Sequence, residues 1–187
     1  MSKNTNLNYL VEAAIFASLA MCLSLIPDFF SWFSPSFGAI PLVLFSLRRG
    51  LKYGLLAGFI WGLLHFTLGK VYYLSLSQVF IEYILAFLSM GIAGLFSSHL
   101  SNAIAHKNKK ATVLLASFVA ILAVFTRYIW HFIAGVIFWG SYAPKGMSAI
   151  WYSFTVNGSA GILTLIIVLI AIYSIISLHE TFFSPKN

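Results

Sequence analysis

The sequence predicts an all-α membrane protein: one integral membrane domain, residues 1–187, with six transmembrane helices and both termini in the cytoplasm. Three observations lead to this class. Of the 187 residues, 60% are hydrophobic and only 8% are charged, whereas soluble domains carry about 25% charged residues. The mean hydropathy is +0.94. The apolar residues also form runs of the length that a membrane-spanning helix needs, roughly 17–25 residues.

The apolar runs set the expected helix boundaries. The first run, residues 8–26, resembles a signal peptide in its position, but it is long, weakly charged at its start and followed by further spans, so we expect a retained membrane helix. The second run, residues 38–47, is short and contains Pro41, so its length fits either a re-entrant segment or a short buried helix. The four remaining helices are expected at residues 51–68, 76–98, 111–138 and 147–178.

The basic residues predict the side of the membrane on which each loop lies, because lysine and arginine concentrate in cytoplasmic loops. With six spans, one side carries most of the basic residues, and the other carries only Asp28, Lys70 and Lys145. Five spans would scatter these charges over both sides. The net charge of +7 therefore reflects topology and does not indicate nucleic-acid binding. The expected cytoplasmic set is Lys3, Arg48, Arg49, Lys52, Lys107, Lys109, Lys110 and Lys186.

The loops on the opposite side are rich in aromatic residues, glycine and proline. They read PDFFSWFSPSF, GKVYYLS and WGSYAPKGM. An aromatic belt at the membrane interface accounts for some of these residues. A lid over a pocket would account for the aromatic residues and the turn formers together, so we expect a pocket that opens to the outside of the cell.

Three ionisable side chains lie inside the apolar segments: Glu82, Arg127 and His131. Such residues are rare at membrane depth and mark either a functional site or an internal pair. Glu82 lies about two helical turns from the outer end of its segment. Two interpretations stay open for it, an ion pair with Arg127 or contact with a ligand.

Polar and aromatic residues recur every four positions around the fifth span, so they follow one side of the helix. They are Arg127, His131, Gly135 and Trp139. Gly135 is expected to leave a gap between the imidazole and the indole, where a flat ligand could lie. The sixth span adds Trp151, Tyr152 and Asn157. The structural alternatives are a core histidine, a helix–helix hydrogen bond from the amide, and plain aromatic packing.

A carboxylate with several aromatic rings suits a flat organic cation, because each cation–π contact contributes roughly 0.5–2 kcal/mol. An anionic ligand would need a surplus of lysine or arginine, which the outer half of the chain lacks. The Asn157 amide can donate to and accept from the edge of a heterocycle. We therefore expect a positively charged or amine-bearing ligand.

Motifs for other functions are missing from the sequence. There is no G-x-x-x-x-G-K-[ST] nucleotide loop and no H-E-x-x-H zinc motif, and four acids make a carboxylate metal site improbable. We therefore expect no enzyme, no catalytic residue, no metal and no cofactor. The lone Cys22 is expected to be a buried, inert thiol. A stand-alone secondary transporter of an organic cation is an alternative, but the inverted repeats that would favour it are not evident.

Six stretches carry a resemblance to a known family: SLIP (24–27), LRRGL (47–51), WGLLH (61–65), YLSLSQVFIEYILAF (73–87), HFIAGVIFW (131–139) and YSFTVNGSAGILT (152–164). In this order, over nearly the full length, they resemble the thiamine-specific substrate-binding subunit (S component) of bacterial energy-coupling-factor (ECF) vitamin transporters. The resemblance implies six membrane helices and high-affinity thiamine binding and uptake at the cell membrane. An S component for another vitamin, or for a thiamine precursor, is the closest alternative.

The resemblance also implies a ligand set. Glu82 would balance the thiazolium charge or accept from the exocyclic amine, and Asn157 would bind the pyrimidine edge. Trp139 and His131 would stack on the ligand. The remaining members are Tyr83, Tyr152 and the lid residue Trp32, with Tyr72 and Trp61 as weaker candidates.

The chain departs from the family pattern at three places. Its first outer loop, WFSPSFGAIP, has no acid where some relatives carry one, and Pro144 replaces an aromatic residue. Arg127 stands where some relatives have lysine. The resemblance allows two partners for the Arg127 side chain: the hydroxyl end of thiamine, or the phosphate of a thiamine phosphate ester.

The partners that the resemblance implies are a transmembrane coupling (T) protein and two cytoplasmic ATPases, which would supply the energy. Small residues four apart allow another helix to approach closely, and the first span has two such pairs. They form the expected docking face: Ala13, Ala14, Ala17 and Ser18. Packing within the bundle is the alternative for this face.

Overall fold

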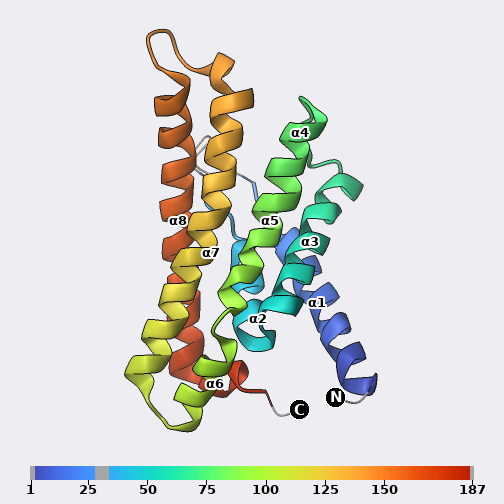
Figure 1. Ribbon diagram of the computed structural model, residues 1–187, viewed down its shortest axis with the longest axis vertical. Helices are drawn as coiled ribbons and strands as arrows, with labels where there is room; N and C mark the ends of the chain where they lie inside the picture. The colour runs from blue at the N-terminus through green and yellow to red at the C-terminus, as the bar shows by residue number, and fades with distance from the viewer. Residues whose placement is uncertain (1–2, 28–33, 186–187) are drawn as a thin grey trace.

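The computed structural model describes residues 3–27 and 34–185, and every regular element in these residues is helical. They form a helical bundle (Figure 1). Its main helices are α1 (Lys3–Leu23), α2 (Ala39–Arg49), α3 (Leu51–Thr67), α4 (Leu76–Val79), α5 (Ala86–Leu88), α6 (Ser97–Ala105), α7 (Lys109–Phe138) and α8 (Ala149–His179). The six apolar runs are therefore helical, as expected, with ends shifted by a few residues.

Four helical segments are long and apolar enough to cross a membrane: Asn6–Leu23, Leu76–Ala105, Lys109–Phe138 and Ala149–Phe183. The second of them is not one uniform helix. Between α4 and α6 the chain passes through a π-helix, η2 (Phe80–Leu85), then α5, then a 3-10 helix, η3 (Ser89–Gly94). The expected helix 76–98 is thus composite, and the separate α6 was not expected from the sequence. Two short 3-10 helices, η4 (Gly140–Tyr142) and η5 (Glu180–Phe183), follow α7 and α8.

Helix α2 is a short buried helix. Its 11 residues extend about 16 Å, which is too short for a hydrocarbon core of about 30 Å. Pro41 lies in the first turn, where a missing N–H group costs no intrahelical hydrogen bond. Most of its apolar side chains are buried, among them Leu42 and Phe45. The segment therefore has the form of a short buried helix, one of the two expected alternatives.

A row of glycines brings α3 against the composite helix. Gly50, Gly54, Gly58 and Gly62 recur every four residues, and we call them the glycine seam. A Cβ atom on Gly58 would lie 3.1 Å from the Cα of Leu88, and one on Gly62 would overlap the carbonyl oxygen of Tyr83. Small residues at this spacing let helices pack closely. The seam thus fixes η2, which carries Glu82, on α3.

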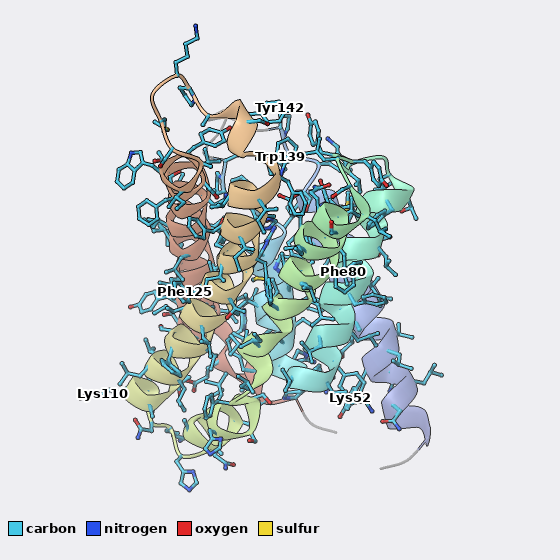
Figure 2. The ribbon with its side chains drawn as sticks, turned by 45° about the horizontal axis from the view of Figure 1, so that its top comes forward. Lys52, Phe80, Lys110, Phe125, Trp139 and Tyr142 are labelled. Atoms are coloured by element: carbon cyan, nitrogen blue, oxygen red, sulfur yellow. The ribbon has the colours of Figure 1, made fainter. Side chains whose placement is uncertain are left out.

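The two ends of the bundle differ in charge. Figure 2 shows Lys52 and Lys110 at one end and Trp139 and Tyr142 at the other. Helix α1 begins at the lysine end, and η5 ends there next to α6 (Figure 1). An even number of crossings accounts for this arrangement, since both terminal segments return to the same end.

The four residues of the expected docking face on α1 differ in burial. Ala13 and Ala17 are fully buried against the bundle, so the expectation that they meet a partner is wrong. Ala14 and Ser18 are exposed, and Cys22, four residues further, is also exposed. The expected burial of Cys22 is therefore wrong, because α1 packs only one of its faces into the bundle.

Candidate functional site

A polar cavity of about 280 Å³ lies between the end of α1, residues 34–37, α3, α5, α7 and α8. Four candidate residues line it: Trp61, Arg127, His131 and Asn157. Its other lining residues were not predicted from the sequence: Leu23, Ser24, Ile26, Ser34, Pro35, Ser36, Phe37, His65, Phe87 and Tyr128. The cavity therefore gathers residues from between positions 23 and 157 of the chain.

Arg127 is the one charged side chain among the residues that line this cavity, and it is only 5% exposed. Its Nη1 donates to Ser36 Oγ at 2.9 Å, and its Nε lies 3.4 Å from His131 Nε2. The guanidinium carbon lies 4.8 Å from the Trp61 ring centre and 4.6 Å from that of Phe87. These contacts hold the side chain firmly, yet every one of them is to a neutral group.

Two histidines reach the cavity. His65, on the last turn of α3, bonds through Nδ1 to the carbonyl oxygen of Trp61 at 2.9 Å. A neutral His65 therefore carries its proton on Nδ1. His131 accepts from Arg127 at Nε2, so a neutral His131 also carries its proton on Nδ1. The sequence signal for His65 was its spacing of four from Trp61, which puts both on one helix face.

Residues 34–37 close one side of the cavity through Ser36. The Ser36 amide donates to Thr164 Oγ1 on α8 at 2.9 Å, while its hydroxyl accepts from Arg127 on α7. Tyr128 bonds to the same Thr164 hydroxyl at 2.8 Å. The loop is thus fastened to both long helices. The expected lid residue, Trp32, lies outside the described residues.

Glu82 belongs to a second group of residues, which includes Trp139 at the end of α7. Figure 2 shows Trp139 at the end of the bundle opposite Lys52. Trp139 Nε1 donates to Glu82 Oε1 at 3.0 Å, and Gln78 Nε2 donates to Oε2. We call Gln78, Glu82 and Trp139 the acidic cluster. The Tyr72 ring meets Trp139 edge-on at 6.1 Å. Arg127 makes no contact with Glu82, so the ion-pair interpretation of these two residues is wrong.

Gln78 sets the position of the Glu82 carboxylate. Its side chain is fully buried, and its Oε1 accepts from the Leu74 amide at 3.1 Å. Because that oxygen is occupied, the NH₂ group must point to Glu82. Ser75 caps α4 by accepting from the Gln78 amide at 3.1 Å. The spacing of four between Gln78 and Glu82 was the signal available in the sequence.

Glu82 also lies inside the π-helix η2. Single π turns inside α-helices occur frequently at functional sites. Tyr83, the next residue, connects the two groups. Its ring centre lies 5.8 Å from that of His65 and 6.0 Å from that of Phe87, both of which line the cavity. Its hydroxyl accepts from the Tyr72 amide at 3.0 Å.

The gap expected at Gly135 is filled by α8. A Cβ atom there would lie 3.0 Å from Ser153 Cβ and 2.9 Å from Asn157 Nδ2. Gly135 is therefore a close-packing position between α7 and α8, and the expectation that it leaves a gap is wrong. Ser153 also accepts from Asn157 Nδ2 at 3.1 Å. Tyr152, one residue earlier on α8, is half-buried and is not part of the cavity lining.

The site thus holds two opposite charges that do not neutralise each other. The carboxylate of Glu82 contacts neutral donors, and the guanidinium of Arg127 contacts neutral acceptors and aromatic faces. Buried charges of this kind are costly unless something compensates them. Both therefore indicate a binding site for a polar ligand.

The sequence of the chain matches that of a known family of membrane transporters. Residues 10–184 match the family model described as "Thiamine transporter protein (Thia_YuaJ)". The chain is 33% identical over 192 residues to the thiamine transporter ThiT of Lacticaseibacillus paracasei, covering 100% of this chain and 96% of the relative. It is 32% identical over 163 residues to the ThiT of Bacillus subtilis, covering 85% of each.

A solved structure of ThiT from Listeria monocytogenes superposes on the fold with a TM-score of 0.91 at 40% identity, over 96% of this chain and 98% of that one. The match therefore extends through both the cavity and the acidic cluster. By sequence and by fold, the chain belongs to the thiamine transporter protein family.

Proposed function

We propose that the chain binds thiamine with high affinity as the substrate-specific subunit of an ATP-driven ECF transporter in the bacterial cell membrane. The observation that carries this proposal is the pair of adjoining polar groups, the acidic cluster and the cavity, linked by Tyr83. Together they offer a carboxylate, aromatic faces and an amide to one flat cation. Family membership supports the choice of thiamine among such cations.

In this proposal each group meets one part of the ligand. The Glu82 carboxylate, which has only neutral partners among the described residues, balances the positive thiazolium. The Trp139 indole beside it offers a face for stacking and cation–π attraction. Asn157, which faces the cavity, binds the edge of the pyrimidine. No cofactor is required, because the protein binds its ligand without changing it.

The distribution of basic residues predicts how the bundle is oriented in the membrane. Lysine and arginine favour the cytoplasmic side, so the end with Lys52 and Lys110 faces the cytoplasm (Figure 2). Trp139 and Tyr142 then lie at the outer surface. Thiamine enters from outside, and the loops at that end are the entrance to the pocket.

Energy comes from partner proteins in this proposal. The sequence has no loop of the kind that binds nucleotide phosphates, so a T protein and two cytoplasmic ATPases supply ATP hydrolysis. Ala14 and Ser18 are the small residues of α1 that face outward. They form the proposed docking site for the T protein, because small side chains allow close helix approach in a membrane.

Intrinsic tryptophan fluorescence of the detergent-purified protein tests the proposal. Thiamine should quench the emission at low concentration, while riboflavin and biotin should not. Trp139→Phe should remove most of the quenching, because the indole lies at the carboxylate. The matched control is Trp151→Phe, since Trp151 is 59% exposed and outside both groups. Equal responses to all three vitamins would refute the specificity for thiamine.

A further inference from the structure

A groove of about 410 Å³ lies between α7 and α8. It is lined by residues of α7 between positions 121 and 132 and by residues of α8 between positions 154 and 165. None of the described residues that line it is charged, and only Tyr128 and Asn157 have polar side chains. Both of these side chains bond to hydroxyl groups of α8. The groove therefore offers a ligand mainly apolar contacts.

Two glycines of α8 shape the groove. A Cβ atom on Gly158 would have no atom of the described chain within 4 Å, so the space beside this residue is open. A Cβ atom on Gly161 would lie 3.0 Å from Cγ of Tyr128, so that ring packs directly on the glycine. Phe125 and Phe154 also line the groove, and both rings are exposed. The groove is thus accessible to whatever surrounds the two helices.

The groove has the length and the depth of one leaflet of a membrane. Both α7 and α8 belong to segments that are long and apolar enough to cross a bilayer. The lined part of each helix extends about 16 Å, and half of a hydrocarbon core of about 30 Å is about 15 Å. The groove begins near the middle of each helix and ends within about two turns of Trp139 and Trp151.

Tryptophan residues concentrate where the hydrocarbon meets the lipid head groups. The groove therefore lies in the hydrocarbon of the leaflet at the Trp139 end. In the orientation proposed above, this is the outer leaflet.

The size of the groove indicates what can occupy it. A helix of the same length, about 10 Å in diameter, has a volume on the order of 1,000 Å³, so a helix of another protein does not fit into 410 Å³. A single acyl chain is narrower and flexible, so it can follow the uneven walls. Lipid tails are as apolar as the lining, so van der Waals contact would supply the attraction.

The groove shares a wall with the polar cavity, because Tyr128 and Asn157 line both of them. We propose that the groove binds one acyl chain of a phospholipid from the leaflet at the Trp139 end, and that this chain packs on the outer side of the cavity wall. Only the name of the leaflet rests on the proposed function, through its orientation. The binding of the chain can therefore be tested without thiamine.

Native mass spectrometry of the purified full-length protein, with dioleoylphosphatidylglycerol added in detergent, tests this lipid site. One phospholipid should remain bound under conditions that remove the detergent. Lysophosphatidylglycerol, which has a single chain, should be retained as well, because the groove holds one chain. Absence of any retained lipid would overturn the inference and leave the proposed function intact.

Variants locate the bound chain. Gly158→Leu should raise the apparent Kd of the lipid by about tenfold or more, because the new side chain enters the open space of the groove. Thr155→Leu is the matched control, since it adds similar bulk at an exposed position of α8 outside the lining, and it should leave the Kd unchanged.

A second variant acts from the opposite wall. Phe125→Ala removes a ring of α7 that lines the groove and should also weaken lipid binding, while size-exclusion chromatography checks that each variant is folded. Wild-type affinity in both Gly158→Leu and Phe125→Ala would show that the lipid binds elsewhere, and the inference would fail.

The lipid head group separates this site from the basic end of the bundle. The lining has no charge, so dioleoylphosphatidylcholine should bind about as tightly as the phosphatidylglycerol. Lys109 and Lys110 are exposed at the start of α7, about 16 Å along the helix from the groove, and they would favour an anionic lipid. A preference for phosphatidylglycerol that Lys109→Gln and Lys110→Gln abolish would place the lipid there and overturn the inference.

Discussion

At the scale of single residues, the membrane interior makes each ionisable group conspicuous. Glu82 is held by Gln78 and Trp139, which fix its direction without cancelling its charge. Arg127 is held by Ser36, His131 and aromatic faces in the same manner. Positioned charges that have no counter-charge among the described residues are expected at binding sites, where a ligand can complete the electrostatics.

Replacing Glu82 by glutamine should raise the Kd of thiamine by about tenfold or more, a loss of about 1.4 kcal/mol. The variant removes the negative charge. It also places an NH₂ group against one of two donors, Trp139 Nε1 or Gln78 Nε2, and the oxygen of Gln78 is already bound to the Leu74 amide. Tryptophan quenching measures the change. The control is Glu180→Gln, because Glu180 lies in η5 at the other end. An unchanged Kd for Glu82→Gln would show that the carboxylate does not contact the cation.

At the scale of elements, packing between helices decides where these residues lie. The glycine seam presses α3 onto residues 83–94, which places Trp61 and His65 beside Phe87 with ring centres 4.3 and 4.5 Å away. These three rings form one wall of the cavity. Loss of the seam would therefore disturb the stability of the protein and the shape of the site together.

Gly62→Ala should destabilise the protein by about 1–3 kcal/mol, the usual cost of overpacking, because the new methyl group would overlap the Tyr83 carbonyl oxygen. It should also weaken thiamine binding, since Tyr83 follows Glu82. The matched control is Gly158→Ala on α8, where nothing lies within 4 Å of the added atom. Thermal unfolding of both variants in detergent, followed by size-exclusion chromatography, makes the comparison. Equal stability of the two would show that α3 can move to accommodate a side chain.

The outward face of α1 gives a second element-scale prediction. Ala14→Trp should leave thiamine binding by the purified protein unchanged but abolish uptake by cells, because a large side chain would keep the coupling protein from α1. Ile170→Trp on α8, at a site that is 60% exposed, adds the same bulk elsewhere on the surface and should leave uptake intact. Normal uptake by cells that carry Ala14→Trp would show that the coupling protein does not dock on this face of α1.

At the scale of the whole molecule, the separation of charge between the two ends orients the bundle. The basic end also contains its own ion pair, between Arg49 and Glu12, and a contact from Arg48 to the carbonyl oxygen of Phe182. Basic side chains there thus tie α1 and η5 to the α2–α3 junction. The opposite end holds the acidic cluster and the aromatic loops.

Cysteine labelling tests the orientation. In a Cys22→Ser background, Lys145→Cys should react with a membrane-impermeant maleimide in intact cells, because it lies in the loop between α7 and α8. Lys110→Cys, at the start of α7, should react only after the cells are permeabilised. Both positions are exposed, so accessibility within the protein does not bias the result. The reverse pattern would place the pocket on the cytoplasmic side.

The sequence by itself determined the helices and pointed to four of the residues that line the cavity. Apolar runs and the distribution of lysine and arginine are local properties, so they predicted six helical segments with both terminal segments at one end. Arg127, His131 and Asn157 were selected because polar groups in apolar runs have a high free-energy cost, and all three line the cavity. Gln78 and the glycine seam also have a signal in the sequence, a spacing of four residues, but this spacing alone does not name the partner that they contact.

Only the tertiary structure decided which of these residues meet. Gly135 lies four residues from both His131 and Trp139, so an open space was expected between their rings. Ser153 of α8 fills that space. Glu82 and Arg127 had opposite charges, yet each is held by neutral partners. Ser36, 91 residues before Arg127, had no feature that predicts a place in the site. The physical reason is that a periodic pattern defines a helix face, whereas the partner of that face depends on close packing between helices that are distant in the sequence.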